Sequence, residues 1–273
     1  YLALDFDPHC SQKFEEKTHS ASWFVKKFNY FTLLPNLSKA ESLHLLGRFA
    51  KITRNVKCAH DEMEILSAAF EILSLQKNIE GHILEAGCFK GGSAAKFSII
   101  TKMLNRKLYL FDSFEGLPEN SENHDTDIVG GRLPSCLECQ YCKEGKEDLC
   151  ENVVYSGGTY KGSLDVVKNN IETYGESAVC NYVKGYFEDT MPKFTENIAF
   201  AYLDVDLASS TRTCLKYIYP LLSKGGTIMS QDGYVPLVVN VFNDDDFWQN
   251  EVGVPKPTIE GLGSRKIITI TKR

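Results

Sequence analysis

From residue 82 onward, the chain alternates short apolar segments with longer amphipathic ones. The apolar segments predict strands at 82–86, 107–112, 178–185, 197–206, 227–232 and 265–272. Apolar residues at helical spacing predict helices at 91–104, 163–175, 209–226 and 235–250. Strands that alternate with helices build a largely parallel sheet with helices on both faces, and ligands bind at the carboxyl ends of its strands. The sequence therefore predicts an α/β fold.

A helical segment precedes this region. Residues 12–76 have helical periodicity, and Ser38 followed by Glu41 fits a capping box at a helix start. A second helix is indicated by apolar residues that share one face: Met63, Leu66, Phe70 and Leu73. We therefore divide the chain into an N-terminal helical extension, 1–80, and a main domain, 81–273. Residues 125–157 interrupt the alternation and are interpreted as an insertion in that domain.

The extension has more apolar surface than the core needs. Its surplus comes from Leu43, Leu45, Leu46 and Phe49. We expect these residues to pack partly on the core and partly on a partner subunit, so the sequence predicts a homo-oligomer, a dimer or larger.

Composition excludes several classes of protein. The 273 residues are 43% hydrophobic and 24% charged, as in globular domains, and the net charge of −6 argues against a dedicated nucleic-acid binder. No apolar run approaches the roughly 18 residues that span a bilayer, and the first residues lack the pattern of a signal peptide. The nine cysteines are odd in number and five are scattered, which favours a reducing cytoplasm over a disulfide-stapled secreted scaffold.

A glycine-containing loop follows the first predicted strand. Gly87, Gly91 and Gly92 let a ligand approach the backbone at a helix start, but their spacing fits neither the dinucleotide nor the phosphate-loop pattern. Glu85 would repel a pyrophosphate and suit a cationic ligand, and Asp112 ends the second strand, where an acid typically accepts hydrogen bonds from ribose. Together these residues favour S-adenosylmethionine. A tight turn without a ligand is the alternative.

Four sequence blocks carry a family resemblance. LEAGCFKGGSA, LYLFDSFEGLP, VKGYFEDTMP and AYLDVDLASSTRTCLKYIYPLLSKGG occur in this order within residues 60–235. They resemble the macrocin O-methyltransferase family, whose members use S-adenosylmethionine to methylate sugar hydroxyls of natural products. The resemblance implies a Rossmann-like class I methyltransferase fold with a seven-stranded sheet, and a divalent metal, usually magnesium, beside the methyl donor.

The same resemblance implies roles for individual residues. Those that would hold the methionine end of the donor, its ribose and its adenine are, in chain order, Glu85, Gly87, Gly91, Ser93, Asp112, Ser113, Gly185, Tyr186, Phe187 and Asp204. Asp204 would also bind the metal, and Asp206 would be the general base. The family has an Asp-Asp pair where this chain has Gln231 and Asp232, so the magnesium would be held by fewer charges.

The chemistry of methyl transfer agrees with such a cluster. A sugar hydroxyl is a poor acid, and a hard cation both orients it and lowers its pKa. Asp204, Asp206 and Asp232 at adjacent strand ends would supply ligands and base at one point. The alternative for Asp204 and Asp206 is a solvated strand end or helix cap. The acidic run 244–246 is interpreted as a turn or cap.

The insertion contains a cysteine cluster. Its members, spaced Cys-x2-Cys-x2-Cys-x7-Cys, are Cys136, Cys139, Cys142 and Cys150. Four thiolates can close a tetrahedral shell around a structural zinc ion, and this spacing resembles the structural-zinc lobe of medium-chain alcohol dehydrogenases. An iron–sulfur cluster, disulfides and free thiols are the alternatives.

Two classes of function are compatible with these features. The first is an O-methyltransferase acting on a hydroxylated small molecule, with a sugar moiety of a natural product or a polysaccharide unit as the expected acceptor. The second is a non-catalytic scaffold of the same fold that binds a protein partner through the zinc lobe. The acidic residues and the glycine loop favour the enzyme, and Gln231 is the feature that favours the scaffold.

Overall fold

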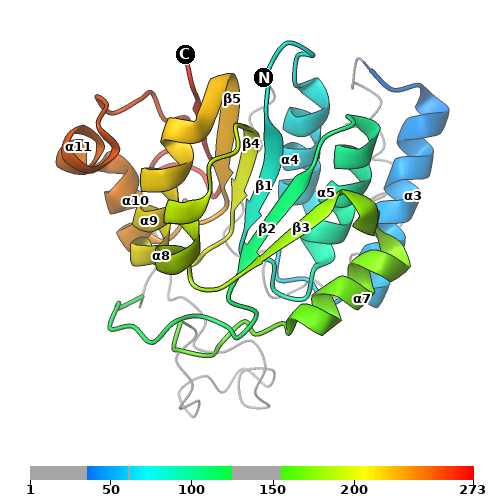
Figure 1. The fold of residues 1–273 in the computed structure, drawn as a ribbon, viewed down its shortest axis with the longest axis horizontal. Helices are drawn as coiled ribbons and strands as arrows, with labels where there is room; N and C mark the ends of the chain where they lie inside the picture. Colours follow the sequence, from blue (N-terminus) through cyan, green and yellow to red (C-terminus); the bar gives the residue numbers. More distant parts are fainter. Residues whose placement is uncertain (1–35, 61, 125–154) are drawn as a thin grey trace.

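A six-stranded sheet forms the centre of the computed structural model, which describes residues 36–60, 62–124 and 155–273 (Figure 1). The strand order is β3-β2-β1-β4-β5-β6. The strands are β1 (His82–Ala86), β2 (Leu108–Asp112), β3 (Cys180–Lys184), β4 (Ile198–Leu203), β5 (Leu222–Ser230) and β6 (Ile268–Thr271). Neighbours from β3 to β5 pair in parallel, and β6 pairs antiparallel to β5. The predicted mostly parallel sheet is confirmed.

The number of strands differs from the seven that the family resemblance implied. The described residues form a six-stranded sheet, and beyond β6 there is only an isolated antiparallel bridge between Glu260 and Thr269. The chain before this bridge contains Pro255 and Pro257, which have no N–H to donate to a ladder. This composition explains why no longer strand forms there.

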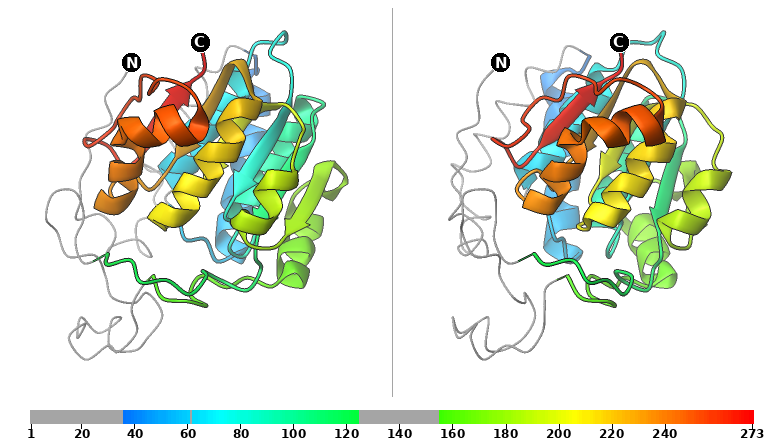
Figure 2. Two further views of the ribbon diagram at one scale, coloured as in Figure 1. Left: turned by 60° about the vertical axis from the view of Figure 1, so that its left-hand side comes forward. Right: turned by 90° about the vertical axis from the view of Figure 1, so that its left-hand side faces the viewer.

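Helices cover both faces of the sheet (Figures 1 and 2). One face carries α3 (Lys39–Asn55), α4 (Glu62–Ser74), α5 (Gly92–Met103) and α7 (Leu164–Tyr174). The other carries α8 (Phe187–Thr190), α9 (Ala208–Leu221), α10 (Pro236–Asn243) and α11 (Asp245–Phe247). Short one-turn elements are η3 (Ser177–Val179), η4 (Met191–Lys193) and η5 (Trp248–Val252).

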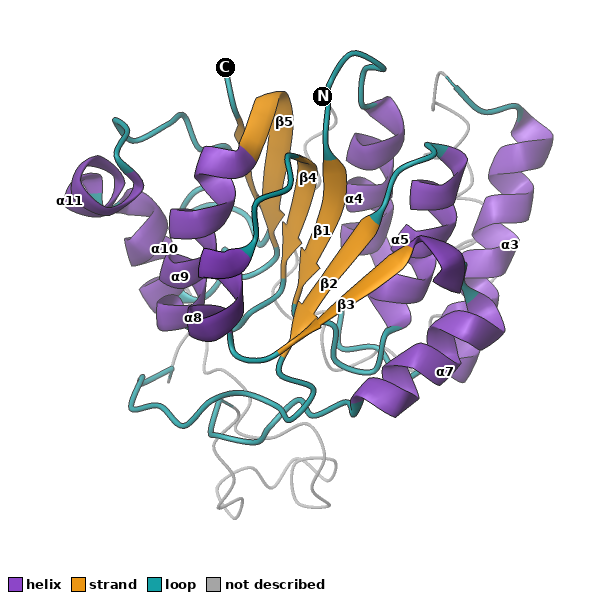
Figure 3. Cartoon of the chain, in the orientation of Figure 1, coloured by secondary structure: helices purple, strands orange, loops and turns teal. Residues whose placement is uncertain are grey.

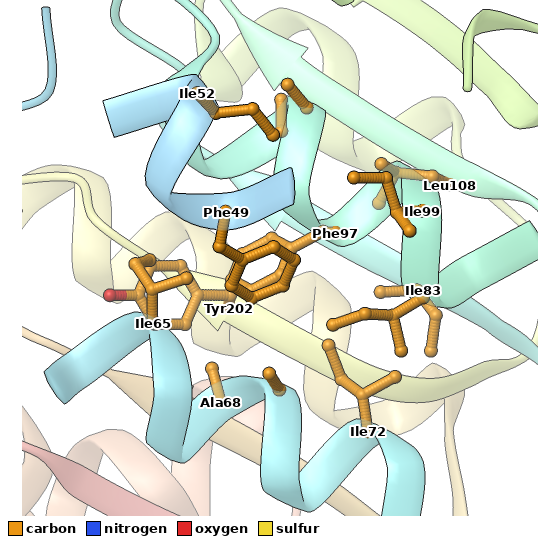
Figure 4. Close-up of a cluster of buried hydrophobic side chains, with 14 of the residues drawn as sticks. Phe49, Ile52, Ile65, Ala68, Ile72, Ile83, Phe97, Ile99, Leu108 and Tyr202 are labelled. Carbon is orange, nitrogen blue, oxygen red and sulfur yellow. The ribbon is translucent and has the colours of Figure 1, made fainter. Parts of the chain in front are cut away.

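Two hydrophobic clusters fill the space between the helices and the sheet. Successive residues of a strand point to opposite faces, so Ile83 belongs to one cluster and Leu84 to the other. In the first cluster, Phe97 of α5 meets Tyr202 of β4 edge-on, with ring centroids 5.2 Å apart (Figure 4). Every residue of β4 is buried, as expected of a central strand covered on both faces.

The N-terminal extension contributes to the first cluster. The predicted capping box of α3 is confirmed, because Ser38 and Glu41 bond each other's backbone N–H groups. Phe49 of α3 and Ile65 of α4 reach the side chains around Phe97 (Figure 4). Residues 1–35 lie outside the described part, so the helical prediction from residue 12 is tested only from residue 36.

Two boundaries differ from the sequence-based expectation. Helix α9 ends at Leu221, not at the glycines 225 and 226, because Leu222 already pairs with Ile198 in the sheet. The helix expected at 235–250 is broken at Asp244, whose side chain caps α11 as the acidic run predicted. In the described part of the chain, no helix combines the length and the apolarity that crossing a membrane requires.

Candidate active site

The strand order reverses between β1 and β4, and the loops that follow these two strands meet there (Figure 3). Gly87 has a φ of +87°, and an added Cβ would lie 1.8 Å from the backbone oxygen of Asp204. Only glycine fits such a contact. Gly87, which the sequence analysis assigned to donor binding, therefore packs against the backbone of Asp204, the first residue of the acidic cluster. This contact lies at the position where open α/β sheets bind their ligands.

Glu85 is fully buried at the end of β1. Neither of its carboxylate oxygens has a hydrogen-bond partner among the described residues. Burial raises the pKa of Glu85 to about 8; the Ser93 side chain opposes this rise and Asp112 adds to it. A buried carboxylate without partners is costly, so this position is suited to a cationic ligand group.

A small cavity adjoins the glycine loop. Its volume is about 10 Å³, room for one water-sized group, and its lining includes Cys58, His60, Cys88, Gly92, Ser93 and Asp204. Residues 57–60, which precede α4, thus reach the predicted donor site. The sequence analysis did not assign them a role, because nothing local in their sequence indicates a ligand.

Asp112 joins two loops at the end of β2. Its carboxylate oxygens accept hydrogen bonds from the backbone N–H of Cys88 at 2.7 Å and of Phe114 at 2.6 Å. Burial raises the pKa of Asp112, and these N–H groups oppose the rise. Ser113, predicted to hold ribose, uses its hydroxyl within its own turn, donating to the Gly116 oxygen at 2.7 Å.

The residues predicted to flank the adenine follow β3, next to the end of β2. Gly185 has a φ of +143° and donates its N–H to the backbone oxygen of Asp112 at 3.0 Å. Tyr186 is exposed, and Phe187 packs against the second hydrophobic cluster. The three residues therefore lie on the same sheet edge as the predicted ribose site.

Three carboxylates meet at the ends of β4 and β5, as predicted. Asp204, Asp206 and Asp232 each place a carboxylate oxygen within 4.8 Å of the others. Asp206 has a φ of +61°, and its N–H and that of Val205 donate to Oδ2 of Asp232, at 3.2 and 3.1 Å. The other oxygen of Asp232, Oδ1, is buried without a hydrogen-bond partner among the described residues. The cluster thus offers a free buried acceptor.

The charges of this cluster oppose one another. Burial, and after it the nearby Asp232, raises the pKa of both Asp204 and Asp206 well above the usual value. Burial raises the pKa of Asp232 to about 6, against the two backbone N–H groups that its carboxylate accepts. A cluster of this kind favours a bound cation, because a cation stabilises all three carboxylates in their charged form.

Gln231 is also at this edge, but its oxygen is engaged. The hydroxyl of the buried Tyr202 donates to Oε1 of Gln231 at 2.9 Å. The neutral oxygen that the sequence analysis offered to a metal is therefore used within the protein.

Three tyrosines face the acidic cluster. The hydroxyls of Tyr155 and Tyr234 lie 3.3 Å apart, and the ring centroids of Tyr155 and Tyr160 are 6.3 Å apart. Burial raises the pKa of each tyrosine, and the charge of Asp206 adds to each rise. Their phenols therefore remain neutral hydrogen-bonding groups beside the carboxylates.

The segment before the insertion is joined by hydrogen bonds to the segment at the end of the insertion. Leu117 donates its N–H to the Thr159 oxygen at 3.0 Å, and Gly158 donates to the Leu117 oxygen at 2.9 Å. The Asn120 side chain donates from Nδ2 to the backbone oxygen of Tyr155 at 2.8 Å. We call these two segments, 116–124 and 155–160, the neck. Figure 1 shows the neck running past the carboxyl edge of the sheet, where the sequence analysis placed the base of the insertion.

The neck is fixed to α9 by Glu122. Its carboxylate accepts from the N–H of Ala208 at 2.7 Å and from the N–H and hydroxyl of Ser209 at 2.8 and 2.6 Å. His124 also contacts Glu122, at 3.0 Å, and its ring lies tilted against that of Tyr155, with ring centroids 4.5 Å apart. Glu122 thus caps a helix that begins two residues after Asp206, a role that the sequence analysis missed because the two segments are 86 residues apart.

Lys266 was also missed. It precedes β6, and its Nζ lies 2.8 Å from Oε1 of Glu64 on α4 and 5.0 Å from the centre of the Tyr234 ring. Sequence patterns gave no signal for this pair, since its members belong to the extension and to the last loop.

The predicted zinc ligands Cys136, Cys139, Cys142 and Cys150 lie outside the described residues. Among the described cysteines, Cys58, Cys88, Cys180 and Cys214 are free thiols. The zinc prediction is therefore not tested by the structure.

The sequence was compared with protein families and with characterised proteins. The family model described as macrocin-O-methyltransferase matches residues 56–138 and 144–260, more than half of the chain. The chain belongs to this family. The predicted family membership is confirmed, and the match covers α4, the sheet through β5, and the whole acidic cluster.

Two curated relatives are O-methyltransferases by name, and the name of the first includes a rhamnosyl group. The 8-demethyl-8-(2,3-dimethoxy-α-L-rhamnosyl)-tetracenomycin-C 4′-O-methyltransferase of Streptomyces olivaceus is 27% identical over 198 residues, 69% of this chain and 66% of the relative. The mycinamicin III 3″-O-methyltransferase of Micromonospora griseorubida is 26% identical over 170 residues, 60% of this chain and 59% of the relative. The chain thus aligns with less than two thirds of the length of each relative.

Solved structures confirm the fold. The O-methyltransferase NovP superposes with a TM-score of 0.55 at 18% identity, covering 77% of this chain and 78% of NovP. The calicheamicin methyltransferase CalS11 superposes with a TM-score of 0.53 at 18% identity, covering 92% and 93% of the two chains. Both proteins are methyltransferases according to their titles, so this chain has a methyltransferase-like fold.

Proposed function

We propose that this protein is an S-adenosylmethionine-dependent O-methyltransferase that methylates a hydroxyl of a sugar moiety on a small molecule. The observation that carries the proposal is the contact between Gly87 and Asp204, which brings a partnerless buried carboxylate, Glu85, and a three-carboxylate cluster to one strand edge. Membership of the macrocin O-methyltransferase family and the rhamnosyl group in the name of one relative support this reading.

The donor is proposed to bind along the ends of β1, β2 and β3. Glu85 would take the ammonium of its methionine end, which supplies the partner that this carboxylate lacks. Gly87, Gly91 and Ser93 would let the donor approach the start of α5, and Asp112 would accept from the ribose hydroxyls through its remaining lone pairs. Gly185, Tyr186 and Phe187 remain the proposed adenine contacts.

The acidic cluster fits a divalent cation such as magnesium. The supporting observation is Oδ1 of Asp232, a buried carboxylate oxygen without a hydrogen-bond partner among the described residues, within reach of Asp204 and Asp206. Asp204 and Asp232 would hold the ion, which supplies Lewis-acid polarisation of the acceptor hydroxyl. Gln231 is a weaker candidate ligand because its oxygen already accepts from Tyr202.

Asp206 is the proposed general base. As the acceptor oxygen forms its bond to the methyl carbon of the donor, the carbon–sulfur bond breaks, and the hydroxyl proton passes to the Asp206 carboxylate. The N–H of Asp206 donates to Asp232, which fixes the backbone of the base. Tyr155, Tyr160 and Tyr234 would form the wall against which the sugar ring packs, and their neutral hydroxyls would bond its other oxygens.

The cysteine cluster is proposed to bind one structural zinc ion, as four thiolates at this spacing can. A homo-oligomer and a cytoplasmic location remain proposals from the sequence.

Calorimetry and a methyl-transfer assay together test the function. We expect S-adenosylmethionine and S-adenosylhomocysteine to bind the purified protein, with magnesium required for turnover but not for donor binding. A panel of 6-deoxyhexosides, including methyl α-L-rhamnopyranoside, should contain an acceptor that gains one methyl group by mass spectrometry. Absence of donor binding would refute the proposal. Donor binding without transfer to any glycoside would refute the sugar acceptor.

A further inference from the structure

Lys266 is a cation held beside the acidic cluster. The turn that carries it packs on Gly233: Gly233 donates its N–H to the Lys266 oxygen at 2.8 Å, and a Cβ at Gly233 would lie 2.6 Å from that oxygen. Because Gly233 directly follows Asp232, this contact fixes the backbone of Lys266 against the cluster. The Lys266 side chain is 23% exposed and that of Glu64 is 10% exposed, so their 2.8 Å ion pair is largely shielded from water.

The charges around this pair are unbalanced. Asp204, Asp206 and Asp232 would carry three negative charges, and Glu64 adds a fourth. The Nζ atom of Lys266 lies 5.0 Å from the centre of the Tyr234 ring, and Tyr234 is two residues after Asp232, so the lysine's charge lies near the carboxylates as well as beside Glu64. The ammonium of Lys266 opposes the rise in pKa of all three aspartates. Burial lowers the pKa of Lys266, but Glu64, with Asp204 and Asp232, raises it overall.

We propose that Lys266 is a built-in counter-charge of the acidic cluster, which competes electrostatically with a divalent ion and is restrained by Glu64. This inference rests on the proposed function for the metal site and goes beyond it, since it assigns a role to two residues outside the cluster. A tethered ammonium near the carboxylates lowers their attraction for a second cation. Glu64 offsets this effect by neutralising the ammonium and by holding it on the side of α4.

The proposal predicts opposite effects for the two halves of the ion pair. Lys266→Met removes the positive charge and should tighten Mn²⁺ binding about fivefold or more. Glu64→Gln removes a negative charge and leaves the ammonium uncompensated, so it should weaken Mn²⁺ binding. Lys266→Arg keeps the charge and should leave the affinity near that of the parent protein. If the pair were only a structural tie between α4 and the last loop, Lys266→Met and Glu64→Gln would shift the affinity in the same direction.

The measurement is a Mn²⁺ titration followed by electron paramagnetic resonance, with the full chain and without donor or acceptor. Mn²⁺ prefers carboxylate ligands, so a zinc-loaded cysteine cluster would not compete for it. Lys256→Met is the matched control: Lys256 pairs with Asp245 at 2.9 Å, its side chain is 27% exposed, and its removal changes the net charge equally. Thermal unfolding of each variant verifies that it is folded.

The inference is overturned if Lys266→Met leaves the affinity unchanged or weakens it, if both halves of the pair act alike, or if neither the parent nor Lys266→Met binds Mn²⁺ at millimolar concentration. It is also overturned if Lys256→Met tightens binding as much as Lys266→Met. No methyl transfer is measured, so a failure of the proposed methyltransferase activity would appear in the acceptor panel and leave this result intact.

Discussion

The buried carboxyl group of Glu85 lowers the stability of the folded protein when no ligand is bound. The carboxylate is fully buried, has no hydrogen-bond partner among the described residues, and has its pKa raised to about 8. Between the unfolded pKa, near 4.5, and 8, the folded state keeps a proton that the unfolded state has lost. Stability therefore decreases as the pH rises through this window and stays low above it.

Replacement of Glu85 by Gln should separate stability from binding. The variant removes the titrating group, so at pH 8 it should be more stable than the parent by roughly 2–4 kcal/mol in urea unfolding, with the difference vanishing near pH 4. It should also bind S-adenosylmethionine at least about tenfold more weakly, because an ammonium then meets a neutral amide. A variant that gains no stability at pH 8, or that binds the donor as well as the parent, would contradict the role given to Glu85.

Asp206→Asn should affect turnover rather than donor binding. The amide keeps the shape of the side chain but cannot take the acceptor proton, so kcat should fall by about 10²–10⁴. The dissociation constant for S-adenosylhomocysteine, measured by calorimetry, should change little. A variant that retains half of the parent turnover would exclude Asp206 as the base.

Residue patterns located the site only in part. Glu85, Gly87, Asp204, Asp206 and Asp232 became candidates because the apolar pattern places them at or just after strand ends and because the family resemblance implied their roles. Lys266 and Glu64 did not, because their meeting depends on packing between the first helices and the last loop. The hydrogen bond from the hydroxyl of Tyr202, on the adjacent strand, to the side-chain oxygen of Gln231 was not predictable either, because it also depends on packing between distant residues.

At the level of elements, α9 depends on a residue outside its own sequence for its start. Its N-cap residue, Leu207, has no side-chain acceptor, and Glu122 of the neck supplies one instead. The cap of α3 was predictable because Ser38 and Glu41 are neighbours in the chain. The cap of α9 was not predictable, because Glu122 is distant in the chain. The sequence analysis also placed the end of this helix too late, because the pairing of Leu222 with the distant Ile198, which begins β5, leaves no local signal.

Glu122→Gln should destabilise the start of α9. Bonds from His124, Ser209 and Ala208 lower the pKa of Glu122 to about 2 against the effect of burial, so its carboxylate stabilises the fold above pH 4.5, and this contribution is lost as the pH falls toward 2. At pH 7 the variant should lose about 1–2 kcal/mol of unfolding free energy in urea. The control Glu119→Gln changes an exposed residue of the same neck. Equal stabilities of the two variants would argue against the cap.

For the whole molecule, two hydrophobic clusters, one on each face of the sheet, form the core of the described residues. Their described members come from the helices, the strands and the loops next to them. The alternation of strands and helices was enough to predict this architecture, because the period of a buried strand and that of an amphipathic helix are fixed by backbone geometry. The seven strands that the resemblance implied are not confirmed, because the described residues form a six-stranded sheet and only an isolated bridge lies beyond β6.

Cys142→Ser should therefore release zinc without unfolding the core. Elemental analysis should give about one zinc per chain for the parent and near zero for the variant, because the four-thiolate shell needs every ligand. The thermal midpoint of the core should change by no more than about 3 °C. Cys214→Ser, at a buried free thiol of α9, is the control that should retain zinc. Parent protein without stoichiometric zinc would refute the site.

The neck has a consequence for how this protein can change over evolution. Hydrogen bonds between Leu117 and residues 158 and 159 already hold the two ends of the insertion together, and Glu122 fastens them to α9. A longer or shorter segment grafted between them adds little loop-closure entropy, which grows only slowly with length. Exchange of this segment can therefore proceed while the sheet and the carboxylates proposed to take part in catalysis, Asp204, Asp206 and Asp232, are inherited unchanged.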